Sequence, residues 1–262
     1  MKFLLFFSVT IFSSLVFGQD IKTCETKLNL SFDKIQLYAN SNDKIKFEEN
    51  YIENSNIKFE RLLLDFTKYQ PKTLIYKFEN LTKKGLKVSS SKDGFFKIYS
   101  WDTESGGTMR SFKNVFQYKD GRKIHSENLI SDKDEYGESM FTYEIIDQVI
   151  SKNKTYYVVK CVFIGSSALS YHKIKIFSIG NDILHENAKL IKTSSGIKNE
   201  LGYEIDFSSI VNRESNSVEM DYAMINYNKK DKIITIPLIT ANGKLTRKKI
   251  NYKFNGEYFK KI

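Results

Sequence analysis

The sequence of 262 residues is poor in several residue types that define protein classes. Its two cysteines are too few for a disulfide-rich scaffold or a multi-cysteine zinc site. It has two prolines and no proline-rich linker that would mark a second independent domain. Beyond the first ~20 residues, no run is apolar enough to cross a bilayer as a helix. The chain does contain 20 Phe and 16 Tyr within a 41% apolar composition, so it can fill a core.

The chain is basic but poor in arginine. Its 41 basic side chains outnumber 31 acidic ones, and five of the 41 are arginine. Reading a DNA groove and binding phosphate with two parallel hydrogen bonds both favour arginine over lysine. We therefore expect no nucleic-acid partner. The lysines accompany abundant Asn and Ile, which is typical of AT-rich coding sequences. We expect most of the charged side chains to lie at solvated strand edges and turns.

The first 18 residues have the organisation of a secretory signal. Lys2 is followed by the mostly apolar run 3–17, and Val16 and Gly18 fit the small-residue rule for cleavage. A membrane anchor is disfavoured, because polar residues from Gln19 onward end the apolar run too early. The sequence predicts cleavage before Gln19 and an exported product, periplasmic or extracellular, without a transmembrane helix.

Export exposes the two cysteines to oxidising conditions. Cys24 and Cys161 could then form a disulfide. Alternatively the two are independent, and Cys161, which lies in an apolar run, is an ordinary buried small side chain. The sequence leaves both alternatives open.

Residues 19–72 are predicted to form a helical N-terminal segment. Two sets of apolar residues recur at helical spacing, and Pro71 should end the second helix because the residue before a proline avoids helical geometry. Each apolar face requires a partner, so we expect the helices to pack on a later sheet. The two sets are Cys24, Leu28, Phe32, Ile35 and Tyr38, then Ile52, Phe59, Leu62, Leu63, Phe66 and Tyr69.

Residues 73–262 are predicted to form an antiparallel β body, packed as one domain with the helices. Two-residue turn signals separate β-prone runs throughout it. In the run 156–164, both alternating sets of positions are mainly apolar, which indicates a central strand buried on two faces. Pro237 indicates an edge strand or a bulge. The predicted fold is mainly β, a hairpin-rich sheet or sandwich. The turn signals are Asp93-Gly94, Asp120-Gly121, Gly180-Asn181, Asn242-Gly243 and Asn255-Gly256.

Residues 91–102, with an Asp-Gly turn before a strand ending in Trp-Asp, resemble the end of one WD-type propeller blade. This resemblance implies a propeller-like fold as the alternative architecture, although the expected repeat every ~40–45 residues is missing. In overall style, the chain resembles uncharacterised exported proteins of AT-rich bacteria. That second resemblance implies export and no particular activity.

The segment 101–110 is the most distinctive candidate site. It holds the single tryptophan, Trp101, with Asp102, Glu104, Arg110 and a glycine pair. As a binding loop, it would stack a ring or sugar on Trp101 and fix polar groups with Asp102, Glu104 and Arg110. Alternatively the segment is a β-turn with positive-φ glycines and a tryptophan packed in the core.

Sequence patterns of common catalytic sites are missing. There is no G-x-S-x-G nucleophile elbow, phosphate-binding loop or dinucleotide fingerprint, and the three histidines have no metal-ligand spacing. We therefore predict no catalytic residue, metal or cofactor. A carboxylate-dependent hydrolase is the enzymatic alternative, since paired acids leave no linear pattern. Its candidate acids are Asp102, Glu104, Asp132 and Glu135.

These observations favour a non-enzymatic, exported binding protein of the bacterial envelope, whose partner is a protein or glycan of unknown identity. The secreted hydrolase is one alternative. A periplasmic immunity or inhibitor protein that blocks a toxin or hydrolase is the other. The sequence does not identify the ligand or the oligomeric state.

Overall fold

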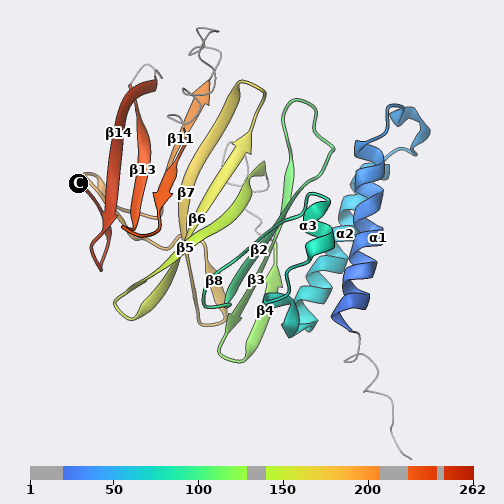
Figure 1. Cartoon of the computed structure of the whole chain (residues 1–262), viewed down its shortest axis with the longest axis horizontal. Helices are drawn as coiled ribbons and strands as arrows, with labels where there is room; N and C mark the ends of the chain where they lie inside the picture. Colours follow the sequence, from blue (N-terminus) through green and yellow to red (C-terminus); the bar gives the residue numbers. More distant parts are fainter. Residues whose placement is uncertain (1–19, 129–139, 207–223, 241–244) are drawn as a thin grey trace, which may run out of the picture.

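The computed structural model describes residues 20–128, 140–206, 224–240 and 245–262. Four layers are stacked along the long axis of the molecule, a helical layer followed by three sheets (Figure 1). We call the sheets A, B and C in their order from the helices. Sheet A has the strand order β1-β2-β3-β4, sheet B the order β11-β7-β6-β5 with β8 added beside β7, and sheet C the order β10-β9-β15-β14-β13-β12.

The helical layer contains α1 (Ile21–Ala39), α2 (Tyr51–Tyr69) and the short α3 (Glu79–Lys83), with 3-10 turns at Lys44–Lys46 and Pro71–Leu74. Helical spacing predicted both long helices and most of their buried faces, but Tyr69, which was expected on the apolar face of the second helix, is 56% exposed. As expected, α2 ends two residues before Pro71. The buried residues Leu28, Phe32 and Phe59 pack with Tyr99 and Trp101 of sheet A. The prediction that the helices cover a sheet is therefore confirmed.

Sheet A has two apolar faces because both sides are covered. It consists of β1 (Lys87–Ser90), β2 (Phe96–Asp102), β3 (Phe112–Asp120) and β4 (Lys123–Glu127). Along β2, Tyr99 and Trp101 pack against the helices, whereas Phe96 and Ile98 pack against sheet B. A strand that is buried on both faces loses the apolar-polar alternation of a half-exposed strand.

Sheet B forms the middle of the stack. Its strands are β5 (Thr142–Ser151), β6 (Lys154–Ile164), β7 (Leu169–Gly180), β8 (Ile183–His185) and β11 (Glu200–Asp206). The apolar run 156–164 lies in β6, between β5 and β7, so the prediction of a central strand is confirmed. Tyr157 and Val159 face sheet A, and Val158 packs with residues of sheet C.

Sheet C is the outermost layer. It contains β9 (Ile191–Thr193), β10 (Gly196–Lys198), β12 (Asn226–Asn228), β13 (Ile233–Ile239), β14 (Leu245–Phe254) and β15 (Phe259–Lys261). The pair β15–β9 is parallel, and the other strand pairs are antiparallel. The register of β13 against β14 shifts beside Pro237, which confirms the predicted bulge. Ile250, Tyr252 and Phe254 alternate along β14 and share its inward face.

The mainly β fold with an N-terminal helical element is thus confirmed. The described strands form stacked layers, and no propeller is formed among them. Residues 91–102 contribute a turn and strand β2 to the four-stranded sheet A. The signal segment 1–18 and the turn at 242–243 lie outside the described residues.

The disulfide hypothesis needs correction. Cys24 and Cys161 are both buried and are not bonded to each other. Cys24 lies on α1 in the helical layer, whereas Cys161 lies on β6 in the core between sheets A and B. Sheet A stands between these two positions, and a disulfide requires Cα atoms within about 7 Å. Cys161 has the role of the buried small side chain in the second alternative.

Candidate functional site

In the predicted loop 101–110, the tryptophan lies in the core and the charged side chains lie at the surface. The side chain of Trp101 is fully buried, with its ring centroid 5.0 Å from that of Phe59 in an edge-to-face contact. Its indole Nε1 donates to Oδ1 of Asn56 at 2.9 Å, and Nδ2 of Asn56 donates to the carbonyl of Thr103 at 2.8 Å. Trp101 is therefore a core residue that anchors α2 to sheet A, and its ring is not exposed to stack on a ligand.

The charged residues of this loop bind one another. Nη1 of Arg110 lies 3.1 Å from Oδ2 of Asp102 and 3.4 Å from Oε2 of Glu104. Partial burial, and then the neighbouring Asp102, raise the pKa of Glu104, while Arg110 opposes this shift. Glu104 has a positive φ of 56°, which a non-glycine residue rarely adopts. The carboxylates and the guanidinium of this loop are thus already occupied within the turn.

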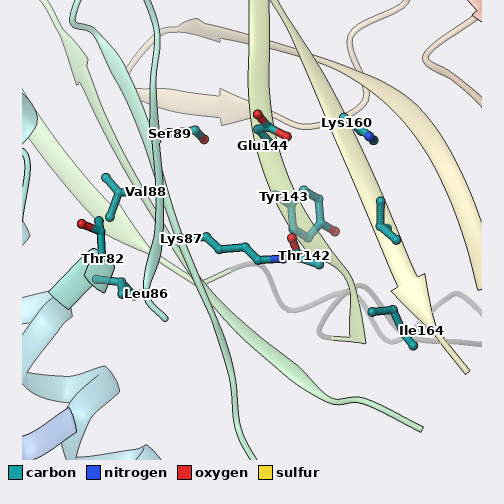
Figure 2. A pocket seen from close by; sticks show the side chains of 11 residues that line it. Thr82, Leu86, Lys87, Val88, Ser89, Thr142, Tyr143, Glu144, Lys160 and Ile164 are labelled. Carbon is teal, nitrogen blue, oxygen red and sulfur yellow. The ribbon is translucent and has the colours of Figure 1, made fainter. Parts of the chain in front are cut away.

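A pocket of about 510 Å³ opens elsewhere, between the edge of sheet A and the edge of sheet B. Figure 2 shows β1 on one side of it and β5 and β6 on the other. Its volume falls within the range of small-molecule sites. The pocket is lined by Thr82, Leu86, Lys87, Val88, Ser89, Thr142, Tyr143, Glu144, Lys160, Val162 and Ile164.

Local structure on the helical side places β1 at the pocket. Gly85, with a φ of 111°, ends α3 in a left-handed conformation. The amide of Leu86 donates to the carbonyl of Leu81, and that of Gly85 to Thr82, which is the pattern of a Schellman cap. The cap turns the chain so that buried Leu86 enters the core and Lys87 begins β1. This lysine extends across the pocket toward Thr142 (Figure 2).

The outer edge of β5 is closed to strand pairing by two serines from sheet A. Oγ of Ser89 accepts the amide hydrogen of Ile145 at 2.9 Å, and Oγ of Ser100 accepts that of Tyr143 at 3.2 Å. An incoming peptide strand would need these amides as donors. The pocket is consequently better suited to a small molecule than to an added β-strand.

The pocket combines charge with an apolar wall. Lys87, Glu144 and Lys160 line it, and the structure gives none of these three an ion pair among the described residues. Glu144 and Lys160 are directly opposite each other on β5 and β6. Leu86, Val88, Val162 and Ile164 supply the apolar part. Two ammonium groups, one carboxylate and an aliphatic wall can bind a ligand with a charged group on an apolar body.

A buried histidine is paired, on the neighbouring strand, with a residue that lines the pocket. His172 on β7 is opposite Val162 on β6, and its side chain is 3% exposed. Its Nε2 lies 2.9 Å from Oγ of Ser170, while Nδ1 is buried without a hydrogen-bond partner. Burial, and then the charge of Lys160, lower the pKa of His172 to about 4. The imidazole is therefore neutral at physiological pH.

The remaining predicted site residues are dispersed. Asp132 and Glu135 lie outside the described residues. His125, His172 and His185 lie on β4, β7 and β8, and no three ligating side chains gather at one point in the described chain. No described helix is long and apolar enough to cross a membrane.

Comparison with known proteins adds no relative. No family model matches the chain, and no curated protein or solved structure matches it. The pocket could not be predicted from the sequence, because its lining comes from two separate parts of the chain, α3 with β1 and β5 with β6. No linear motif joins these segments.

Proposed function

We propose that this protein is an exported binding protein of the bacterial envelope and that the pocket between sheets A and B is its ligand site. The observation that carries the proposal is the pocket of about 510 Å³, with Lys87, Glu144 and Lys160 at its wall and no ion pair among the described residues to occupy them. The ligand is a small amphipathic molecule. Its anionic group binds the two lysines, and its apolar body lies against the aliphatic wall.

The composition of the pocket supports binding over hydrolysis. Glycosidases of the common kind need two carboxyl groups across the substrate. The pocket lining supplies one, Glu144. Asp102 and Glu104, the described candidates for such a pair, both bind Arg110 instead. The signal-like segment 1–18 supports export, and the amphipathic pocket supports capture of a small molecule outside the cytoplasm.

The binding proposal can be tested with a fluorescent anion and a simple fatty acid. Anilinonaphthalene sulfonate joins an anionic group to an apolar ring system, and decanoate should displace it from the pocket. The double variant Lys87→Gln/Lys160→Gln should weaken both ligands by about tenfold or more, since a hydrogen bond to a charged group contributes ~1.5–3 kcal/mol. Fluorescence titration and calorimetry measure the two affinities.

The matched control removes two exposed lysines that lie on elements contributing to the pocket but outside its lining. Lys83 lies on α3 and Lys154 on β6, and neither lines the pocket. Lys83→Gln/Lys154→Gln should bind both probes like the wild type. A Val162→Trp variant should block the pocket with its larger side chain. Equal affinities in all these variants would reject the pocket as the binding site.

A further inference from the structure

The outer face of sheet C carries a lateral row of lysines. Lys260 on β15 is directly paired with Lys192 on β9 and with Lys253 on β14. All three side chains are exposed. Neighbouring strands lie ~4.8 Å apart, so these three lysines lie side by side on adjacent strands. Like charges placed directly opposite destabilise a sheet, so this row needs a compensating environment.

The sheet itself supplies little compensation. The outward positions of its strands hold no Asp or Glu, and Arg247 adds a further exposed cation on β14. One acid, Glu257, lies in the turn before β15, where its carboxylate is 2.6 Å from Nζ of Lys152 and interacts electrostatically with Lys192. In the described part of the chain no element packs on this face, which is the outermost layer of the stack (Figure 1).

Apolar side chains accompany the lysines. Ile197 on β10 is opposite Lys192 and is 37% exposed, while Ile262 follows β15 and is 69% exposed. From β10 to β14 the row therefore consists of Ile197, Lys192, Lys260 and Lys253 on successive strands. Ile233 of β13 lies beside Lys253 at the other end of the row. Exposed isoleucines among lysines are typical of a surface that contacts both the headgroups and the acyl boundary of a membrane.

We propose that the outer face of sheet C docks on the surface of an anionic lipid bilayer. The uncovered strand face is accessible to a bilayer surface, and the lysine row matches the negative charge of that surface. Lysine suits this role because its compact, hydrated charge is attracted to a diffuse layer of headgroups without a fixed bidentate geometry. Docking by this face would leave the pocket between sheets A and B, two layers away, open to solvent. The inference is independent of the ligand proposed above.

Vesicle co-sedimentation of the full chain tests this inference. The probes are vesicles of phosphatidylcholine alone and of phosphatidylcholine mixed with phosphatidylglycerol, each at low and high salt. We expect binding that requires phosphatidylglycerol and weakens with salt. The triple variant Lys192→Gln/Lys253→Gln/Lys260→Gln should lose roughly fivefold in partition for each lysine removed. Equal binding to phosphatidylcholine alone and to the anionic mixture would overturn the proposal, because the lysine row would then contribute nothing.

The control removes three exposed lysines from the helical layer at the other end of the molecule. Lys27→Gln/Lys34→Gln/Lys58→Gln changes the net charge equally and should leave vesicle binding near the wild-type level. Circular dichroism verifies that both triple variants fold. Equal losses in the two variants would reject the proposed face. Salt-sensitive binding to soluble dextran sulfate without vesicle binding would also overturn the proposal, in favour of a linear polyanion.

Discussion

At the scale of single residues, Lys97 has the most unusual environment. It lies on β2 with 1% exposure and faces the helical layer. Its Nζ donates to the carbonyl of Thr73 at 2.9 Å and to that of Tyr76, and lies 5.4 Å from the ring centroids of Phe78 and Tyr99. No carboxylate is among these partners. Burial therefore lowers the pKa of Lys97 to about 7.

This pKa shift predicts how stability depends on pH. Between about pH 7 and the ordinary lysine pKa of 10.5, the unfolded chain binds more protons at this site than the folded chain. The free energy of unfolding should therefore rise with pH, with a slope that cannot exceed ~1.4 kcal/mol per pH unit. Below pH 7 the site is protonated in both states and contributes no slope. Lys97→Met should remove this rise, as measured by urea unfolding at pH 7 and pH 9.

The control for this prediction is Lys77→Met, which removes an exposed lysine next to the same segment. Lys77→Met should retain the wild-type slope. If Lys97→Met retains it as well, the rise has another origin.

Asn56 and Trp101 show how far the sequence informs on individual side chains. Asn54, Ser55 and Asn56 interrupt an apolar pattern and could be taken for a helix break, yet α2 is continuous through them. Asn56 is 2% exposed because it binds Trp101 in β2 and Thr103 just after that strand, both distant in sequence. A polar residue in a helix indicates a buried hydrogen bond only when its partner is known, and that partner comes from the tertiary structure.

At the scale of elements, turn positions were harder to predict than the strands that they join. The loop before β8 consists of Asn181 and Asp182, both with positive φ, one residue later than the Gly180-Asn181 prediction. The loop between β5 and β6 consists of Lys152 and Asn153, again both with positive φ, and no glycine marked it. A type I′ turn needs two left-handed residues, and strand register decides which two.

The edge of β5 gives an element-scale prediction. Ser89→Ala should leave the Ile145 amide without its acceptor, and its hydrogen exchange should accelerate by about tenfold, which corresponds to a hydrogen bond of ~1–1.5 kcal/mol. Exchange measured by NMR tests this directly. Ser90→Ala, at an exposed position on the same strand, should leave the exchange rate of Ile145 unchanged. An unchanged rate in Ser89→Ala would show that the serine does not protect the edge.

At the scale of the whole molecule, Asp147 connects the three sheets. Its side chain is 1% exposed on β5 of sheet B. Oδ1 lies 3.2 Å from Nζ of Lys92 in the β1–β2 turn of sheet A, and Oδ2 accepts a hydrogen bond of 2.7 Å from the hydroxyl of Tyr227 in sheet C. Burial, and then Asp147, raise the pKa of Tyr227. This buried carboxylate therefore fixes the neighbouring layers relative to sheet B.

Removal of one of these contacts should loosen sheet C. Tyr227→Phe deletes the hydroxyl and should lower the free energy of unfolding by ~1.5–3 kcal/mol, because a buried carboxylate loses a hydrogen bond. Native-state proteolysis should then cut within sheet C before the other layers. Tyr156→Phe is the control, since the hydroxyl of Tyr156 makes no hydrogen bond among the described residues. Equal stabilities of the two variants would contradict a role for Asp147 in joining the layers.

Local pattern by itself determined the two long helices, the β character of the remainder and the central position of 156–164, because helical spacing and two-sided burial are properties of neighbouring residues. The stacking of three sheets was decided by the tertiary structure. It buried Trp101, separated Cys24 from Cys161 and brought Lys87 and Lys160 to one pocket. Contacts between layers join residues distant in sequence, so their geometry is set by packing and register, which leave no linear pattern.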